Sequence, residues 1–219
     1  MRFDCAIFDL DGTVVDSHGD IADALNAALA ESGLPTHPIE EIEGMIGDGV
    51  GMLVARALLP EHAHDAPQIT TLFRAKYAAN LVGKTHVYPG VREICEAARA
   101  RGVRLAIATN KPTRFAKAVV EKLGLLPLFA VVVGEGDPPL PRKPDPAMVD
   151  HVLAELGVPR ERTLYVGDSL VDAQTAKNAR LPLALVTWGY TARAALAQAA
   201  PDWLVDDAAT LQKILLDGK

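Results

Sequence analysis

The second half of the chain alternates short apolar runs with segments whose apolar residues recur at helical spacing. The apolar runs cover residues 103–108, 129–133, 163–166 and 183–187, and residues 3–8 form another near the start. Helical segments are predicted at about 91–100, 113–123, 146–157 and 173–179. Strands that alternate with helices pair in parallel, because each helix carries the chain back to the starting edge of the sheet. We therefore expect an α/β fold with a doubly wound parallel sheet.

A block of helical segments interrupts this alternation near the N-terminus. Between Ser17 and about Gly83 the apolar residues recur at helical spacing, and no convincing strand is found. Asp16 or Ser17 is expected to cap the first of these helices. We expect two domains: a core formed by residues 1–15 and 85–219, and an inserted all-helical domain formed by residues 16–84.

The first apolar run ends in two carboxylates and a glycine, Asp9-Leu10-Asp11-Gly12. Residues i and i+2 of a strand point to the same side, so Asp9 and Asp11 are expected together where the strand ends. Two like charges that close repel each other unless a raised pKa or a bound cation compensates. Mg²⁺ prefers oxygen ligands and often takes only one or two carboxylates. The same pattern also fits an exposed turn after a buried strand, so residues further along the chain must decide.

Other polar residues follow the later strands. Thr109 and Asn110 follow one strand, Asp168 follows another with Asp172 beyond it, and Lys143 lies in a loop after a third. Each has a simpler explanation on its own. Thr109 and Asn110 could cap the next helix, and Lys143 could be a solvated charge. Asp168 could belong to an ordinary turn. Because ligands bind beyond the carboxyl ends of parallel strands, we expect all of them in one pocket with the first carboxylate pair.

Composition argues against some classes of partner. The chain has 219 residues with 22 Lys and Arg against 28 Asp and Glu, a net charge of −6 at pH 7. Without a basic excess, nucleic acid and an anionic membrane surface are not expected partners. No apolar run is long enough to span a membrane, and the N-terminal residues lack the apolar region of a signal peptide. Cys5 and Cys95 are predicted to be reduced core thiols, which fits a cytoplasmic location. The sequence does not indicate an oligomeric state.

Four short motifs resemble, in order, those of the haloacid dehalogenase-like hydrolase superfamily. They are Asp9-Leu10-Asp11-Gly12-Thr13, Thr109-Asn110, Lys143-Pro144-Asp145-Pro146 and Gly167-Asp168-Ser169-Leu170-Val171-Asp172. The resemblance covers essentially the whole chain, and the helical block is similar to the cap inserted after the first motif in one subgroup. Within that subgroup the chain most resembles the bacterial phosphoglycolate phosphatases, through Ile46-Gly47-Asp48-Gly49-Val50, Tyr88-Pro89-Gly90-Val91, Thr109-Asn110-Lys111-Pro112 and Thr187-Trp188-Gly189-Tyr190.

This resemblance implies a Mg²⁺-dependent hydrolase of a small phosphomonoester, most simply 2-phosphoglycolate. Asp9 would attack phosphorus and form an aspartyl phosphate. Asp11 would protonate the leaving oxygen and then activate water. Mg²⁺ would be held by a side-chain oxygen of Asp9, the backbone carbonyl of Asp11 and the carboxylate of Asp168. Asp172 would lie in the outer shell or bind only occasionally.

The remaining motif residues are expected to bind the phosphoryl group. Thr109 and Asn110 would donate hydrogen bonds to it, and Lys143 would offset its charge while keeping Asp9 ionised. The sequence does not single out a cation for the carboxylate end of a substrate such as 2-phosphoglycolate. Arg56 and Lys84 are candidates, but each is more simply a surface charge.

Several other functions stay open on the sequence. A phosphatase for a sugar phosphate such as N-acetylmuramic acid 6-phosphate, or a β-phosphoglucomutase-like phosphomutase, would keep both Asp9 and Asp11. A dehalogenase would not need the acid–base Asp11. A receiver-like module that binds a phosphoryl group without turnover also has a doubly wound fold with an aspartate, a threonine and a lysine. The helical insertion and the Asp-x-Asp-Gly after the first strand disfavour that module.

Overall fold

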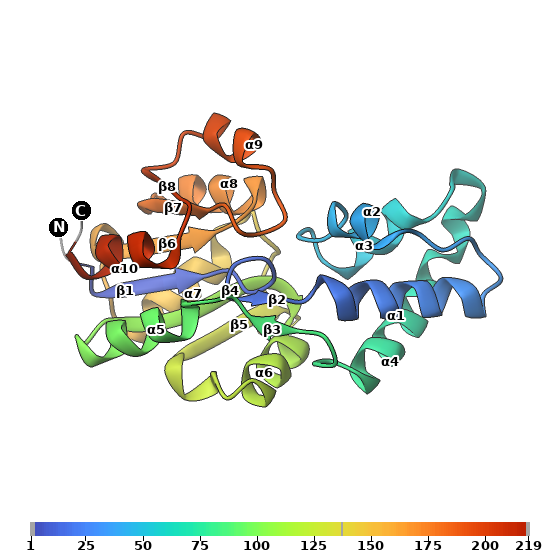
Figure 1. The fold of residues 1–219 in the computed structure, drawn as a ribbon, viewed down its shortest axis with the longest axis horizontal. Helices are drawn as coiled ribbons and strands as arrows, with labels where there is room; N and C mark the ends of the chain where they lie inside the picture. The colour runs from blue at the N-terminus through green and yellow to red at the C-terminus, as the bar shows by residue number, and fades with distance from the viewer. Residues whose placement is uncertain (1–2, 137, 218–219) are drawn as a thin grey trace.

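The computed structural model describes residues 3–136 and 138–217, and its main feature is a six-stranded parallel sheet (Figure 1). The strand order is β5-β4-β1-β6-β7-β8. These strands are β1 (Cys5–Phe8), β4 (Arg104–Pro112), β5 (Val131–Glu135), β6 (Thr163–Gly167), β7 (Leu183–Val186) and β8 (Trp203–Val205). The chain runs outward from β1 to β4 and β5, and then returns to build β6, β7 and β8 on the other side of β1. The predicted α/β fold with a doubly wound parallel sheet is confirmed.

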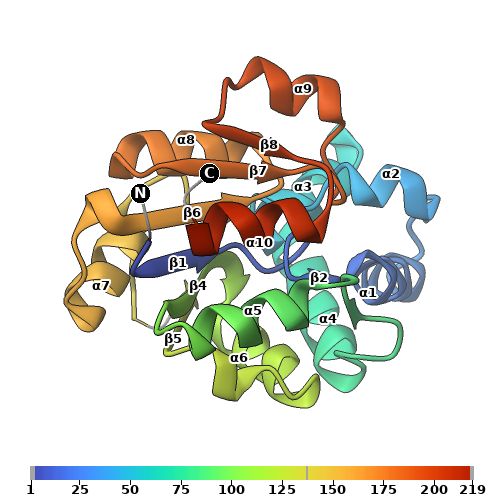
Figure 2. The same cartoon turned by 60° about the vertical axis from the view of Figure 1, so that its left-hand side comes forward.

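Helices cover both faces of this sheet (Figure 2). One face packs against α5 (Val91–Ala100), α6 (Thr113–Lys122) and α10 (Ala208–Asp217). The other packs against α7 (Ala147–Leu156), α8 (Leu170–Ala179) and α9 (Arg193–Gln198). Phe8 and Ile107 join the core on the first face, whereas Ile7 and Ala106 join the core on the second. Because both faces are buried, these strands read as continuous apolar runs in the sequence.

Strand β4 extends further than the predicted strand at 103–108. Its pairing with β5 shifts register between Ala108 and Pro112. Thr109 and Asn110 therefore belong to the strand, and the N-cap of α6 is Pro112. The simpler explanation of Thr109 and Asn110 as helix caps is wrong.

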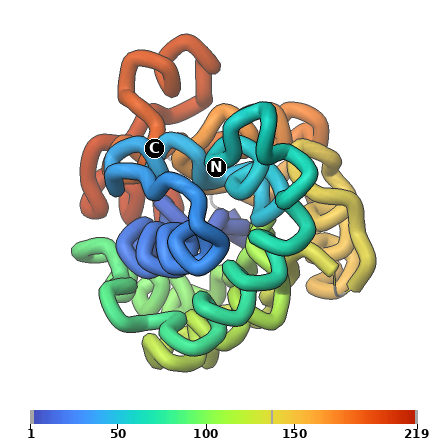
Figure 3. The backbone as a smooth tube through the Cα atoms, turned by 90° about the vertical axis from the view of Figure 1, so that its right-hand side faces the viewer, coloured from blue at the N-terminus to red at the C-terminus, as the bar shows by residue number. Residues whose placement is uncertain are grey.

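Four helices follow the first strand and lie beside the sheet (Figure 1); seen from that side they stand in front of it (Figure 3). They are α1 (His18–Glu31), α2 (Ile39–Glu43), α3 (Val50–Ala57) and α4 (Ala66–Ala79). Short 3₁₀ helices occupy Pro60–Asp65, Leu126–Leu128 and Arg160–Arg162. Within the described ranges, none of the helices combines the length and apolarity needed to cross a membrane.

Two short strands connect this helical block to the sheet. Strand β2 (Val15–Asp16) pairs antiparallel with β3 (His86–Val87), so the outgoing and returning chain segments lie side by side. The sequence predicts no strand there, because two residues are too few to show an alternation of apolar and polar side chains. The domain boundaries placed at residues 15/16 and 84/85 stay a prediction.

The carboxylate of Asp20, in the first turn of α1, ties the outgoing helix to the returning segment. It accepts hydrogen bonds from the backbone N–H groups of Gly83 (3.0 Å), Lys84 (3.0 Å) and Thr85 (2.8 Å), and from Thr85 Oγ1 (2.6 Å). Burial alone would raise the pKa of Asp20, but these hydrogen bonds outweigh it and lower the pKa. Asp20 thus stabilises the junction between the helical block and the sheet.

The two cysteines lie far apart in the fold and are buried. Cys5 is in β1 and Cys95 is in α5, and both are free thiols. Burial raises the pKa of each thiol to about 12. Both are therefore unreactive core residues, as the sequence predicted.

Candidate active site

The polar residues singled out in the sequence meet where β1, β4 and β6 end. Asp9 directly follows β1, Asp168 directly follows β6, and Thr109 and Asn110 lie near the end of β4. Lys143 reaches the same place from the loop after β5. The strand order reverses between β1 and β6, so this edge is the switch point at which doubly wound folds bind ligands.

Asp9 and Lys143 form a buried ion pair. Lys143 Nζ lies 2.8 Å from Asp9 Oδ1 and 2.8 Å from Asp172 Oδ1. Burial raises the pKa of Asp9 to about 6, although the Lys143 ammonium acts to lower it. Burial disfavours the charged form of Lys143, but Asp172 and Asp9 outweigh that effect and raise the pKa of the ammonium. Asp9 therefore lies beside a cation that stays charged at neutral pH.

Asp9, Asp168 and Asp172 bring carboxylate oxygens within 4.8 Å of one another, all of them buried. No well-directed hydrogen bond reaches Asp9 Oδ1. Asp168 accepts a hydrogen bond from Thr13 Oγ1 at 2.8 Å on one oxygen and from the Tyr190 N–H at 2.9 Å on the other. Each of these oxygens keeps a lone pair. Burial, followed by the charges of Asp172 and Asp9, raises the pKa of Asp168. Crowded carboxylates with unused lone pairs fit a hard divalent cation such as Mg²⁺.

Asp172 differs from Asp9 and Asp168 because both of its oxygens already accept several hydrogen bonds. Its Oδ1 accepts hydrogen bonds from Lys143 Nζ (2.8 Å) and from the hydroxyl of Tyr165 (3.1 Å). Its Oδ2 accepts from the N–H groups of Asp168 (3.2 Å) and Ser169 (3.1 Å) and from Ser169 Oγ (2.6 Å). A carboxylate offers about four lone-pair sites, so Asp172 has none to spare for a metal. It fits the expected outer position, from which it orients Lys143.

Two glycines allow the chain to close around Asp168. A Cβ atom at Gly12 would lie 2.3 Å from Asp168 Oδ2, and one at Gly189 would lie equally close to the same oxygen. Gly12 also has a φ of 85°, which side chains other than glycine rarely adopt. The glycine that follows the first carboxylate pair is therefore required by its packing against the carboxylate after β6.

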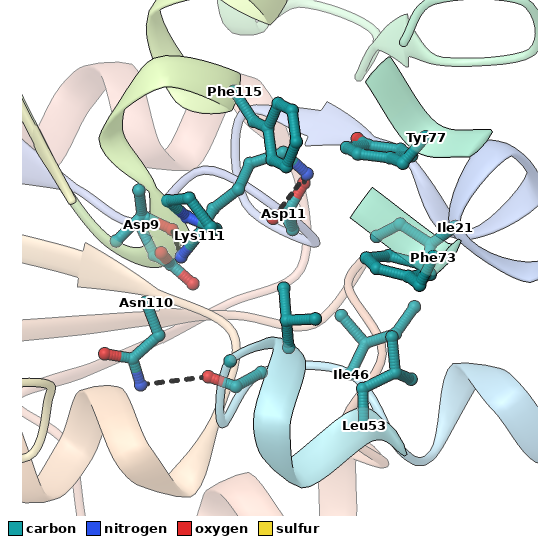
Figure 4. Close-up of a pocket in the computed structure, with 15 residues that line it drawn as sticks. Asp9, Asp11, Ile21, Ile46, Leu53, Phe73, Tyr77, Asn110, Lys111 and Phe115 are labelled. Carbon is teal, nitrogen blue, oxygen red and sulfur yellow. Dashed lines mark hydrogen bonds and ion pairs between the residues drawn. The ribbon is translucent and has the colours of Figure 1, made fainter. Parts of the chain in front are cut away.

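Asp11 is held by a different cation from the one beside Asp9. Lys111 Nζ lies 2.9 Å from Asp11 Oδ1 and 3.1 Å from Asp11 Oδ2 (Figure 4), and Ser17 Oγ donates to Oδ1 at 2.5 Å. Burial disfavours a charged Lys111, but the Asp11 carboxylate outweighs it and raises the pKa of the ammonium. Ser17 occupies the N-cap position of α1, as expected, but its side chain makes no capping bond. Asp16 Oδ1 instead accepts from the N–H of His18, the first residue of the helix, at 3.4 Å.

Lys111 is the site residue that the sequence analysis missed. The motif Thr109-Asn110-Lys111-Pro112 contains it, but the motif does not indicate its role. Because it lies two residues after Thr109 on the same strand, its side chain faces the same side of the sheet edge. That relation could have pointed to it.

Thr109 and Asn110 use their side chains differently. Asn110 Oδ1 accepts from the N–H of Lys143 (2.8 Å), and Asn110 Nδ2 donates to the carbonyls of Lys143 (3.2 Å) and Gly47 (3.1 Å). The amide thus fixes the Lys143 backbone and reaches the helical block, with both of its N–H groups occupied. Thr109 Oγ1 accepts from the N–H of Lys111 (3.2 Å), which leaves the threonine proton free to donate.

A cavity of about 50 Å³ separates the sheet edge from the helical block. Its polar wall is formed by Asp9, Asp11, Thr109, Asn110 and Lys111. Facing them are apolar side chains that come mainly from the helical block (Figure 4): Ile21, Ile46, Val50, Leu53, Phe73 and Tyr77. Neither of the cations considered for the far end of a substrate lines this cavity. Arg56 pairs with Asp48, and Lys84 pairs with Asp23 at 2.6 Å.

The chain is similar to known proteins along most of its length. The model of the haloacid dehalogenase-like hydrolase family matches residues 3–180. A phosphoglycolate phosphatase of Rhodospirillum rubrum is 43% identical over 195 residues, which cover 84% of this chain and 80% of that protein. One of Haemophilus influenzae is 37% identical over 218 residues, covering 95% and 96%. The crystal structure of a predicted phosphoglycolate phosphatase from Haemophilus somnus has a TM-score of 0.89 and 32% identity, and the match covers 98% of both chains.

Proposed function

Because the chain belongs to the haloacid dehalogenase-like hydrolase family, we propose that it is a Mg²⁺-dependent phosphatase that converts 2-phosphoglycolate to glycolate and phosphate. The observation that carries this proposal is Asp9, a buried carboxylate beside the Lys143 ammonium, at the polar wall of the cavity. Relatives named phosphoglycolate phosphatase match over most of the chain and support the choice of substrate.

The first step is the attack of Asp9 on phosphorus. The new bond joins a carboxylate oxygen of Asp9 to phosphorus, while the bond from phosphorus to the glycolate oxygen breaks. Asp11 supplies a proton to that leaving oxygen. The Lys143 ammonium, 2.8 Å from Asp9, offsets the charge of the transferring group, and the Thr109 hydroxyl donates to it. Asn110 holds Lys143 in place through its backbone.

The second step returns the enzyme to its starting state. Asp11, now a carboxylate, takes a proton from a water molecule whose oxygen attacks phosphorus. The bond to Asp9 breaks, and inorganic phosphate leaves. Ser17 and Lys111 orient the Asp11 carboxylate through their hydrogen bonds to it.

The buried acidic residues fit a divalent metal, which supplies charge neutralisation for the phosphoryl oxygens when it is bound. Asp9 and Asp168 would hold Mg²⁺ through carboxylate oxygens, and Asp11 through its backbone carbonyl. Asp172 would keep Lys143 oriented from outside this set. Among the described residues no well-directed hydrogen bond reaches Asp9 Oδ1, and Asp168 keeps free lone pairs; both observations support this assignment.

We also propose that residues 16–84 form a cap domain. Its helices supply the apolar wall that faces the catalytic carboxylates, and an apolar wall keeps bulk water away from the aspartyl phosphate. The hydrogen bond from Asn110 to Gly47 and the one from Arg142 Nη1 to the carbonyl of Asp48 (3.2 Å) support contact between this cap and the core.

A sugar phosphate is the alternative substrate, either for hydrolysis or for a phosphomutase reaction. The apolar cavity wall disfavours it, because Ile46, Leu53 and Phe73 offer no partners for the hydroxyl groups of a sugar. A binding module without turnover is disfavoured by the presence of Asp11 beside Asp9 in the cavity wall.

The test is a panel of phosphomonoesters assayed for phosphate release with Mg²⁺. The panel contains 2-phosphoglycolate, N-acetylmuramic acid 6-phosphate, β-glucose 1-phosphate and a nucleoside monophosphate. We expect the highest kcat/KM for 2-phosphoglycolate, and we expect EDTA to abolish all activity until Mg²⁺ is restored. If a sugar phosphate gave the highest value, the proposed substrate would be wrong and only the chemistry would stand.

A further inference from the structure

Lys111 is the one cationic side chain among the described residues that line the cavity. It is 7% exposed, and its ammonium lies between the Asp11 carboxylate and the ring of Tyr77, 4.6 Å from the ring centroid. Lys143, the other buried lysine of the site, is committed to Asp9 and Asp172 and does not line the cavity. A second anionic group on a substrate would therefore find Lys111 as its partner.

The position of Lys111 also sets how far that anionic group can be from the reacting bond. In the proposed reaction Asp11 gives its proton to the leaving oxygen, so that oxygen must lie next to Asp11. Lys111 Nζ is 2.9 Å from Asp11 Oδ1, within one hydrogen bond of the acid–base group. In 2-phosphoglycolate a single CH₂ group joins the leaving oxygen to the carboxylate. The Lys111 ammonium and the Asp11 carboxylate are thus adjacent, as are the carboxylate and the leaving oxygen of the substrate that they would contact.

The rest of the described lining holds no second cationic side chain that could compete for a carboxylate. The cap-side side chains that line the cavity are apolar apart from Tyr77, and the other polar atoms there are backbone groups, such as those of Gly47 and Gly49. The Tyr77 ring already contacts the Lys111 ammonium, so its hydroxyl belongs to the same wall. A carboxylate bound to Lys111 would meet an N–H donor of a cation beside the Tyr77 hydroxyl.

We propose that Lys111 is the specificity-determining residue of the site: its ammonium binds the substrate's carboxylate, and it selects phosphomonoesters of α-hydroxy acids. This inference rests on the proposed phosphatase function and adds the group that recognises the leaving acid. When the substrate binds, its carboxylate shares the ammonium with Asp11, since a lysine has three N–H donors. Esters that lack the carboxylate, or carry it one carbon further away, lose this contact.

The experiment compares three substrates on the Mg²⁺-loaded protein: 2-phosphoglycolate, 2-hydroxyethyl phosphate, in which a CH₂OH group replaces the carboxylate, and 3-phosphooxypropanoate, which is one CH₂ longer. The kcat/KM ratio of 2-phosphoglycolate to 2-hydroxyethyl phosphate is measured for wild type, Lys111→Met, Lys111→Arg and Lys84→Met. Lys84→Met is the matched control, because Lys84 is an ion-paired lysine outside the cavity. Using a ratio cancels any loss common to all substrates that follows from the contact of Lys111 with Asp11.

In Lys111→Met we expect this ratio to fall about 10- to 100-fold, the effect of losing one charged hydrogen bond, mainly through KM for 2-phosphoglycolate. Lys111→Arg should retain part of the preference for 2-phosphoglycolate, and Lys84→Met should leave the ratio unchanged. Wild type should also prefer 2-phosphoglycolate to the longer ester, and Lys111→Met should not.

An unchanged ratio in Lys111→Met overturns the role of Lys111 while the substrate assignment stands. A wild type without preference for 2-phosphoglycolate overturns the proposed substrate itself. If Lys111→Met does not fold by circular dichroism, Lys111→Gln is judged by the same ratio.

Discussion

Asp9 at the sheet edge and Asp20 at the base of the helical block are both buried aspartates, yet their surroundings are opposite. Asp9 is 6% exposed and its Oδ1 lacks a well-directed hydrogen bond, whereas Asp20 is 2% exposed and accepts hydrogen bonds from Gly83, Lys84 and Thr85. Burial raises the pKa of Asp9, while the hydrogen bonds outweigh burial and lower the pKa of Asp20. A buried carboxylate whose close partner is a lysine ammonium rather than a set of backbone N–H donors is suited to an incoming ligand, and one with all its donors in place is suited to hold structure.

The strongest test of this comparison is Asp9→Asn. An amide cannot attack phosphorus as a carboxylate does, so we expect kcat to fall by more than about 10⁴-fold. The fold should survive, because burial penalises only the charged form of Asp9. Phosphate release measures the first expectation, and urea unfolding measured by circular dichroism measures the second.

The control for Asp9→Asn is Asp150→Asn, which changes a half-exposed aspartate on α7 that pairs with Arg160. It should keep full activity. Turnover of Asp9→Asn close to that of wild type would show that Asp9 is not the nucleophile.

A second test separates Asp168 from Asp172 in the acidic cluster. Asp168→Asn should raise the Mg²⁺ concentration needed for half-maximal activity by at least about 10- to 100-fold, because a direct ligand oxygen is lost. Asp172→Asn should change this Mg²⁺ requirement less and lower kcat instead, since Asp172 orients Lys143. Mg²⁺ titration of phosphate release checks both. An equal Mg²⁺ requirement for the two variants would contradict the different roles inferred from their hydrogen bonds.

The site residues around Asp9 could be predicted from the sequence, whereas the hydrogen-bond partners of Asp20 could not. Asp9, Thr109 and Asp168 each occur where an apolar run ends, and parallel strands bring such positions to one edge regardless of the details of packing. The order of the four motifs added the chemistry. Their convergence therefore depends on the fold class alone, which the alternation of strands and helices predicts.

Contacts that depend on the path of a loop or on one side chain's reach could not be predicted in the same way. Asp20 finds its donors in Gly83, Lys84 and Thr85, more than sixty positions away in the chain, with no periodicity to relate them. Lys111 reaches Asp11 from the extension of β4, which lies beyond the predicted strand at 103–108. For such pairs the sequence shows which residues are charged, but not which partner neutralises them.

A third test addresses the other half of the comparison. Asp20→Asn keeps the shape of the side chain but removes the charge that the Gly83, Lys84 and Thr85 donors contact. We expect it to lower the free energy of unfolding by about 1–3 kcal/mol, the usual cost of losing hydrogen bonds to a buried charged group. Asp23→Asn is the matched control, because Asp23 is exposed and pairs only with the Lys84 side chain; it should change stability by less than about 0.5 kcal/mol. Equal stabilities for the two variants would contradict the anchoring role of Asp20.

The pH dependence of stability should differ in sign between the two aspartates. Asp20 has a lowered pKa in the folded protein, so its contribution is present above the ordinary value of 3.8 and is lost as the pH falls further. The stability deficit of Asp20→Asn should therefore be constant near neutral pH and shrink below about 3.8.

For Asp9 the folded pKa is raised to about 6 from 3.8, so ionisation costs stability as the pH rises through that window. With a chelator present, Asp9→Asn should be more stable than wild type above pH 6, and this advantage should vanish toward pH 3.8. Urea unfolding of both variants at several pH values checks both expectations. If the two variants differed from wild type in stability with the same sign and the same pH dependence, the contrast in hydrogen bonding would not control the titration of Asp9 and Asp20.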